Sequence, residues 1–309
     1  MATEQVIHPP RRVLHEYHRE WLETPEDHGI RIGRWEARRG RVPCLVVEPD
    51  ESVGASPRGM LVRKQLEEAG VTLASFGKVD RAVILFHGRK GRKEDLLPIA
   101  ERFCAVGFRC FLPDLPAHGE SPEQRATYAI GEFEGSLAER LWQEAREEGW
   151  SGEVPCSLWG MSMGGAFVTR AASREGGSWE NAVILCSFDQ FPLVMEEQAG
   201  RLLGPLRGLA IDEVRRRVKR RTGLRLEEGR SDLWAQRVTV PVFLAHGPKD
   251  RIISMKRGRS LYEAMASEKK RWVEVPGANH HDILITDFPL YAMMAAWMLG
   301  QDWEARDEG

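Results

Sequence analysis

Short apolar runs recur along the chain, and amphipathic segments separate them. A strand that is buried on both faces is nearly continuously apolar, and helical connections between such strands are typical of a parallel sheet. The pattern therefore predicts an α/β fold whose sheet is covered on both faces. The strand-like runs are residues 82–86, 108–112, 154–159, 182–186, 240–245 and 271–275.

The first strand-like segments are arranged differently. Residues 30–36 and 42–47 are strand-like, and only the short turn-like stretch Arg38-Arg39-Gly40-Arg41 separates them. Two strands joined by so short a connection pair with each other in antiparallel orientation. We therefore expect an antiparallel hairpin before the parallel strands.

One later segment does not fit the alternation of strands and helices. Residues 188–237 have a helical pattern and are too long for an ordinary loop, so we predict a small helical cap inserted into the core. The core is then formed by residues 30–187 and 238–309, and residues 1–29 are an N-terminal extension.

A basic run, residues 215–221, lies within the predicted cap. Ile211, Val214 and Val218 recur there at three- and four-residue spacing, which favours an amphipathic helix with a solvated basic face over a nucleic-acid site. The remaining alternative is that this face attracts anionic substrates.

Composition excludes several classes of protein. The chain has 309 residues, 42% of them hydrophobic, and a formal net charge of −2, so it can bury a large core and has no global attraction for nucleic acid. Its N-terminal residues lack the apolar core of a signal peptide, and no run approaches the length of a membrane span. Five cysteines without C-x-x-C spacing indicate free thiols rather than a disulfide or zinc framework. We therefore expect a cytoplasmic protein.

The most informative motif is Gly160-Met161-Ser162-Met163-Gly164-Gly165, which lies between a strand-like and a helix-like run. A sharp strand-to-helix corner forces its central residue into strained backbone angles and leaves no room for Cβ atoms two positions away on either side. Glycines at 160 and 164 remove those atoms. The motif predicts a nucleophile elbow that presents Ser162 at the N-terminus of the following helix.

A serine hydroxyl needs a base, and a histidine is the usual one. His280 follows the last predicted strand and so belongs to the same sheet edge as Ser162, whereas its neighbour His281 remains a competing candidate. The histidine in turn needs a carboxylate. Asp250 follows the preceding strand and is our choice, with Asp189 as the rival acid.

An oxyanion intermediate needs two N–H donors. The residue after the nucleophile, Met163, supplies one. The loop after residues 82–86 begins His87-Gly88-Arg89, and we expect the Arg89 N–H to be the second donor. The His87 ring is expected to hold neighbouring loops together rather than to transfer protons.

Together these motifs resemble the α/β-hydrolase superfamily. Besides the elbow, the stretch 112–121 is similar to a loop that such proteins carry, and His246-Gly247-x-x-Asp250 and Gly277-Ala278-Asn279-His280 resemble their acid and histidine loops. The resemblance implies an eight-stranded, mostly parallel sheet and places the catalytic roles on Ser162, Asp250 and His280. It also points to carboxylesterases, monoacylglycerol-lipase-like enzymes and related serine peptidases, although Arg89 and Lys90 argue against a purely lipophilic substrate.

We therefore expect a serine hydrolase that cleaves small carboxylic esters without a metal or other cofactor. Amidase, peptidase or thioesterase activity with the same residues is the alternative, and a non-catalytic binding protein on this fold is a third possibility. Phe191 and Met195, in the predicted cap, are the expected substrate-binding residues. The sequence predicts no nucleic-acid partner, and it does not give the oligomeric state.

Overall fold

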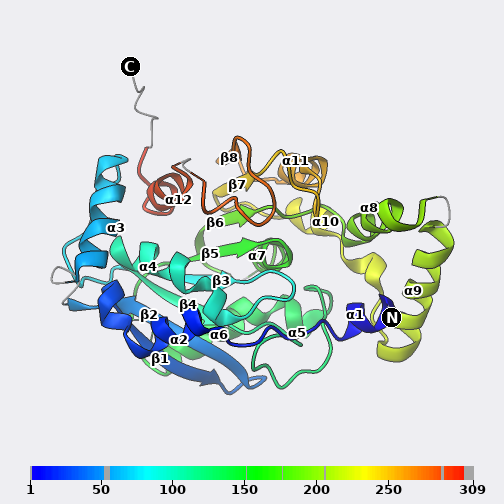
Figure 1. Ribbon diagram of the computed structural model, residues 1–309, viewed down its shortest axis with the longest axis horizontal. Helices are drawn as coiled ribbons and strands as arrows, with labels where there is room; N and C mark the ends of the chain where they lie inside the picture. Colours follow the sequence, from blue (N-terminus) through cyan, green and yellow to red (C-terminus); the bar gives the residue numbers. More distant parts are fainter. Residues whose placement is uncertain are drawn as a thin grey trace.

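A single eight-stranded sheet organises the chain (Figure 1). The structure is a computed structural model that describes residues 2–51, 56–150, 152–175, 177–204, 207–286 and 289–302. The strand order is β1-β2-β4-β3-β5-β6-β7-β8. The expected α/β fold with eight strands is confirmed. The strands are β1 (Ile30–Ala37), β2 (Val42–Pro49), β3 (Arg81–Phe86), β4 (Phe108–Pro113), β5 (Cys156–Met161), β6 (Trp179–Leu185), β7 (Val242–His246) and β8 (Lys270–Glu274).

Strand direction follows the sequence prediction. β1 pairs with β2 as an antiparallel hairpin, and β2 is also antiparallel to β4. From β4 to β8 every neighbouring pair is parallel. The carboxyl ends of β3, β5, β7 and β8 therefore lie at one edge of the sheet, where the loops with the candidate residues begin.

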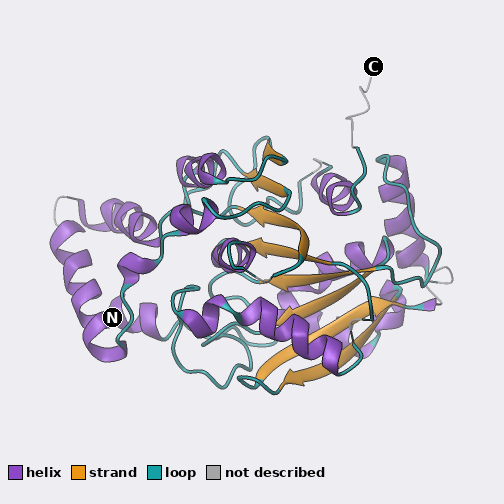
Figure 2. Cartoon of the chain, turned by 180° about the vertical axis from the view of Figure 1, so that it is seen from behind, coloured by secondary structure: helices purple, strands orange, loops and turns teal. Residues whose placement is uncertain are grey.

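The sheet is covered on both faces, as Figure 2 shows. Alternate residues of β3 belong to different hydrophobic clusters: Ala82, Ile84 and Phe86 pack on one side, and Val83 and Leu85 on the other. Each of these residues is fully buried. A strand that must fill two cores has no solvated face, which explains why its sequence is apolar without alternation.

Helices from different parts of the chain supply the two cores. The first cluster contains residues of α6, α7 and α11, and the second contains residues of α3, α4 and α12. The helices are α1 (Ala2–Ile7), α2 (Glu16–Glu23), α3 (Pro57–Glu68), α4 (Leu97–Ala105), α5 (Glu132–Gly135), α6 (Leu137–Glu147), α7 (Met163–Ala172), α8 (Phe191–Leu203), α9 (Arg207–Thr222), α10 (Ser231–Ala235), α11 (Met255–Ala264) and α12 (Leu290–Met298), with short 3-10 turns at Pro25–His28, Lys93–Leu96 and Leu226–Glu228.

The described part of the segment after β6 is mainly helical, and α8 and α9 lie together at one end of the molecule (Figure 1). In α9, Ile211, Val214 and Val218 are buried, so this helix has the amphipathic character that its spacing predicts. Helix α1 packs against α9, and Glu4 forms an ion pair with Arg221. The start of the chain is thus joined to this helical segment.

The sequence did not predict α1 or α2. Between them the chain runs in an extended path along the carboxyl edge of the sheet, anchored by Arg11, whose guanidinium donates to the carbonyl oxygens of Gly119, Ser121 and Glu123 at 2.7–2.8 Å. None of the described helices is long and apolar enough to cross a membrane.

Candidate active site

Ser162 stands at a strained corner between β5 and α7. Its backbone angles are φ 58° and ψ −121°, a conformation that few residues with a side chain adopt. A Cβ at position 160 would collide with the Gly164 carbonyl, and one at position 164 with the Phe86 carbonyl. The turn therefore closes only with glycine at both positions, and α7 begins at Met163 with its first N–H groups free of intrahelical partners.

His280 and Asp250 come together from the loops after β8 and β7. The His280 Nδ1–H donates to the Asp250 Oδ2 at 2.6 Å, and the other oxygen of Asp250 accepts the N–H groups of Ile252 and Ile253 at 2.8 Å each. Both side chains are buried. Because Nδ1 holds the ring proton, Nε2 is left as the basic nitrogen of a neutral His280.

Asp250 is held in its charged form. Burial alone would raise its carboxyl pKa, but hydrogen bonds from His246 and His280 and from the Ile253 N–H outweigh burial, so the pKa lies well below its ordinary value. A permanent negative charge beside His280 can stabilise the imidazolium that forms when this ring accepts a proton.

The competing residues, Asp189 and His281, make other contacts. Asp189 pairs with the buried Arg257 at 3.0 Å. His281 is exposed, and its backbone N–H donates to the Asn279 Oδ1. Of the two candidate acids and the two candidate histidines, the structure joins Asp250 to His280.

The loop after β3 passes directly over the serine. A Cβ at Gly88 would lie 3.4 Å from the Ser162 Cβ, and the Gly91 N–H donates to the Gly88 carbonyl at 3.0 Å, which closes a tight turn. Arg89 and Lys90 are the central residues of that turn, and Lys90 has a φ of 65°. Arg89 thus directly follows the glycine that faces Ser162.

His87 connects this loop to the loop after β4. Its Nε2 accepts the Leu115 N–H at 3.1 Å, so Nδ1 carries the proton and donates to the Gly88 carbonyl at 2.8 Å. Burial lowers the pKa of His87 to about 4, which keeps the ring neutral. These bonds agree with the expectation that His87 holds loops together.

Several known proteins are similar to this chain. A family model described as serine aminopeptidase, S33, matches residues 77–215, which is less than half of the chain and includes the loop after β3 and the elbow. A Bacillus subtilis (strain 168) protein named "Putative esterase YitV" is 27% identical over 218 residues, which cover 64% of this chain and 82% of that protein.

Two solved structures have the same architecture over most of their length. The esterase Pf2001 of Pyrococcus furiosus superposes with a TM-score of 0.64 at 17% identity and covers 97% of this chain and 99% of its own. The chain has the α/β-hydrolase fold. The monoacylglycerol lipase of Paleococcus ferrophilus, at a TM-score of 0.54 and 21% identity, covers 74% of this chain and 98% of its own.

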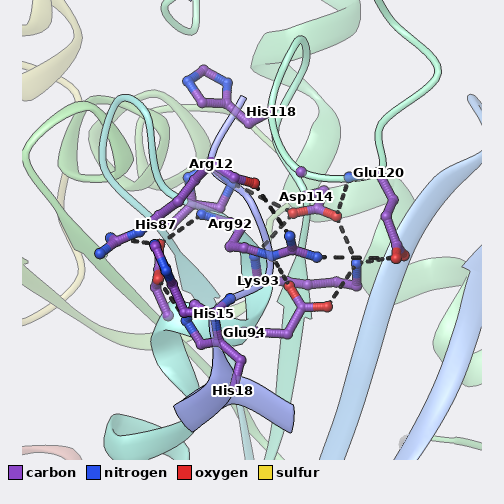
Figure 3. Close-up of polar contacts among 12 residues, drawn as sticks. Arg12, His15, His18, His87, Arg92, Lys93, Glu94, Asp114, His118 and Glu120 are labelled. Carbon is purple, nitrogen blue, oxygen red and sulfur yellow. Dashed lines mark hydrogen bonds and ion pairs between the residues drawn. The ribbon is translucent and has the colours of Figure 1, made fainter. Parts of the chain in front are cut away.

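A network of mostly buried charges lies behind the loop after β3 (Figure 3). The Lys93 ammonium lies 2.7 Å from Asp114, 2.7 Å from Glu120 and 3.2 Å from Glu94, and the Lys93 N–H donates to the other oxygen of Asp114. Burial opposes the charge on Lys93, but the three carboxylates raise its pKa above the ordinary value. The network ties the loop after β3 to the loop after β4.

Ser162 and His280 line the same cavity, which has a volume of about 640 Å³. Its wall combines apolar side chains with cations, and part of it comes from the extended segment between α1 and α2. The lining residues are Pro10, Arg11, Arg12, His87, Gly88, Arg89, Lys90, Gly91, Asp95, Leu96, Ile99, Trp159, Met161, Ser162, His280, His281 and Leu284.

The residues expected to bind substrate lie outside this cavity wall. Phe191 and Met195 do not line the cavity that contains Ser162. Phe191 instead stacks on Tyr128, with ring centroids 4.2 Å apart, and Met195 packs against the same hydrophobic cluster. Arg11 and Arg12 lie on the cavity wall, a position that nothing in the sequence of the N-terminal extension indicates.

Proposed function

We propose that this protein hydrolyses carboxylic esters through an acyl-enzyme formed on Ser162. The observation that carries the proposal is that His280, with its tautomer fixed by Asp250, lines the same cavity as Ser162. The esterase and lipase named among the similar structures, and the esterase named among the relatives, support the ester as the substrate class.

In the first half of the reaction the Ser162 Oγ attacks the ester carbonyl carbon while its proton passes to the His280 Nε2. The N–H groups of Met163 and Arg89 stabilise the negative charge that develops on the carbonyl oxygen. Each donor lowers the free energy of the transition state by about 2.7–4 kcal/mol. The tetrahedral intermediate collapses when His280 returns the proton to the leaving alkoxide.

In the second half, His280 removes a proton from water as the water oxygen attacks the acyl carbon. Collapse of the second intermediate breaks the bond to Ser162, which regains its proton from His280. The acid product then leaves, and the net reaction consumes one ester and one water. The chemistry needs only the serine, the histidine and the carboxylate, so the proposal includes no metal or other cofactor.

The proposal assigns residues 188–237 the role of a helical cap. Phe191 and Met195 then hold α8 against the core through their packing, because the cavity wall does not include them. Substrate contacts come instead from the residues that line the cavity beside Ser162.

The test is turnover of p-nitrophenyl esters together with labelling by a fluorophosphonate probe. Ser162→Ala should abolish both while the melting temperature stays near that of the wild type. Ser173→Ala is the matched control, since it lies at the other end of α7 and donates to the Arg170 carbonyl. Labelling of the Ser162→Ala variant at wild-type rate would reject Ser162 as the nucleophile.

Amide hydrolysis is the second candidate, and the description of the matching family model as a serine aminopeptidase favours it. The same residues can cleave either bond. Matched p-nitrophenyl ester and p-nitroanilide substrates with one acyl group separate the two reactions, and anilide turnover at or above ester turnover would replace the ester proposal.

A further inference from the structure

The wall of the cavity that contains Ser162 has a marked excess of positive charge. Arg11, Arg12, Arg89 and Lys90 line it, and Asp95 is the one carboxylate among its lining residues in the described part of the chain. Few of these cations are neutralised. Arg12 pairs with Asp95 at 3.2 Å, but Asp95 also accepts from His18, so one carboxylate serves several donors.

Within the described part of the chain, the other cations have no carboxylate partner. Arg11 donates to backbone carbonyl oxygens of the loop after β4, and Arg89 donates to the Gln5 carbonyl. A carbonyl oxygen satisfies a guanidinium hydrogen bond but leaves the charge in place. Lys90 is exposed and belongs to none of the ion pairs formed by the described residues.

The charges behind the wall are largely paired with one another. Arg92 contacts Glu94 at 2.6 Å, and Lys93 is surrounded by Glu94, Asp114 and Glu120. Because these groups pair with one another, they offset only part of the positive charge of the cations at the cavity wall. The charge at the cavity wall therefore remains positive.

The position of Lys90 relates this charge to the reacting group. A Cβ on Gly88 would be in van der Waals contact with the Ser162 side chain, and Lys90 follows two residues later in the same tight turn. Its ammonium lies on a flexible stem that extends from the left-handed position of the turn. An anionic group a few bonds away from the scissile carbonyl is within reach of this ammonium.

Apolar residues complete the wall. Leu96, Ile99, Trp159, Met161 and Leu284 give the cavity a surface suited to a hydrocarbon chain. A substrate that matches both kinds of surface has an apolar part and an anionic group in one molecule. A neutral, purely apolar ester would leave the cations without a partner.

We propose that the preferred substrates of the esterase are esters that carry a carboxylate or phosphate group near the scissile bond, with Lys90 as the main specificity-determining cation. This inference rests on the proposed function. Arg11, Arg12 and Arg89 add to the positive potential, and Lys90 makes the direct contact because its charge has no other partner among the described residues.

The experiment compares kcat/KM for three p-nitrophenyl esters of similar length: a neutral butyrate, a hemiglutarate with a terminal carboxylate, and an acyl ester with a terminal phosphate. We expect both anionic esters, or one of them, to exceed the neutral ester by tenfold or more at low salt. The excess should shrink as the salt concentration rises, because screening weakens the attraction. Which anionic ester is faster identifies the group.

Lys90→Gln should lower the ratio of anionic to neutral kcat/KM at least fivefold, mainly through KM, and Lys90→Arg should restore it. Lys64→Gln is the charge-matched control: it removes one cation from α3, where Lys64 pairs with Glu68 on the helix surface, and should leave the ratio unchanged.

The outcomes separate this inference from the function on which it rests. Turnover that depends on Ser162 but shows no preference for the anionic esters overturns the inference and leaves the esterase proposal standing. A preference that Lys90→Gln does not reduce removes Lys90 from its role. Absence of turnover with all three esters rejects the esterase proposal and this inference with it.

Discussion

The Nδ1–H of His280 donates to the Oδ2 of Asp250 at 2.6 Å, and the other Asp250 oxygen is held by two backbone N–H groups. One carboxylate oxygen thus faces the backbone of its own loop, and the other faces His280 and, at 3.4 Å, His246. This division fixes which nitrogen of His280 is free to act as a base, and it does so before any substrate arrives.

Asp250→Asn should therefore act through the histidine tautomer. The N–H groups of Ile252 and Ile253 still donate to the amide oxygen, so the amide NH₂ group faces His280. Because this NH₂ group donates, the His280 Nδ1 must be unprotonated, and the ring proton moves to Nε2. A serine triad with this wrong tautomer loses about 10³–10⁴-fold in kcat. We expect a loss of that size in ester turnover, with a far-ultraviolet circular dichroism spectrum like that of the wild type.

Asp189→Asn is the matched control for Asp250→Asn. Asp189 is also a buried aspartate, but it pairs with Arg257. Its replacement should lower the melting temperature and leave kcat of the folded protein within a few fold. A large kcat loss in Asp189→Asn together with a small one in Asp250→Asn would transfer the acid role to Asp189.

Much of this site could be predicted because its chemistry lies in local motifs. The elbow, the loop after β3 and the loops that carry Asp250 and His280 each follow a predicted strand, and parallel strands bring their carboxyl ends to one edge. The order of strands in the sequence was thus enough to predict that Asp250 and His280 lie at the same edge. The fold was predictable for the same reason, since strands buried on both faces leave a strong apolar signal.

The remaining features depend on contacts that sequence patterns do not report. Arg11 reaches carbonyl oxygens more than 100 residues away in the chain, so nothing near residue 11 indicates a cavity wall. Helix α1 is six residues long and is held by distant partners, including the Tyr128 hydroxyl, which donates to the Val6 carbonyl. β6 begins at Trp179, earlier than expected. The sequence predicts a later start because the polar residues Glu180 and Asn181 interrupt the apolar run.

The elbow can be tested through its glycines. A Cβ at position 164 would overlap the Phe86 carbonyl, which is a backbone atom of the neighbouring strand and cannot move aside as a side chain can. We expect Gly164→Ala to destabilise the protein by about 3 kcal/mol or more, beyond the typical 0.5–3 kcal/mol of a point mutation, or to prevent folding. Urea unfolding followed by fluorescence measures the change.

Gly208→Ala is the control for Gly164→Ala and should not destabilise the protein. Gly208 lies in α9, and a Cβ there would meet no atom within 4 Å. Alanine in a helix is favoured over glycine by about 0.8–1 kcal/mol, so this variant should be neutral or slightly more stable. Equal destabilisation by the two substitutions would mean that the predicted collision at position 164 does not occur.

His87 should make stability depend on pH. Its pKa in the folded protein is about 4, below the ordinary value of 6.5, so between these values the unfolded chain binds a proton that the folded protein does not. Above about pH 6.5 the titration of His87 does not lower the free energy of unfolding. As the pH drops from 6.5 towards 4, it lowers the free energy of unfolding progressively. The loss is at most about 1.4 kcal/mol per pH unit for one proton.

His87→Gln removes this titration while an amide can still accept from Leu115 and donate to Gly88. The variant should be less stable than the wild type at pH 7.5, by about 1–3 kcal/mol if one of these hydrogen bonds is lost, and its stability should change less between pH 6.5 and 5. His118, whose pKa burial lowers to about 3, keeps part of the dependence. Identical pH slopes in urea unfolding would exclude His87 as a source.

The last prediction concerns Lys93, the buried cation behind the loop after β3. Its side chain is 2% exposed, and the side chains of Asp114 and Glu94 around it are 0% and 1% exposed. Lys93→Met fills similar space but leaves these carboxylates without their ammonium. Breaking a buried ion pair by removing one partner costs about 3–5 kcal/mol, because the remaining charge stays desolvated.

We therefore expect Lys93→Met to lose about 3–5 kcal/mol in urea unfolding, whereas Lys64→Met, which removes an exposed lysine paired with Glu68 at 3.7 Å, should lose no more than about 1 kcal/mol. The double variant Lys93→Met with Asp114→Asn should be less destabilised than the sum of the single variants, because the amide is neutral. Strict additivity would show that the two groups do not interact. A loss below 1 kcal/mol in Lys93→Met would show that water already reaches the carboxylates, so that the network does not fix the loop beside Ser162.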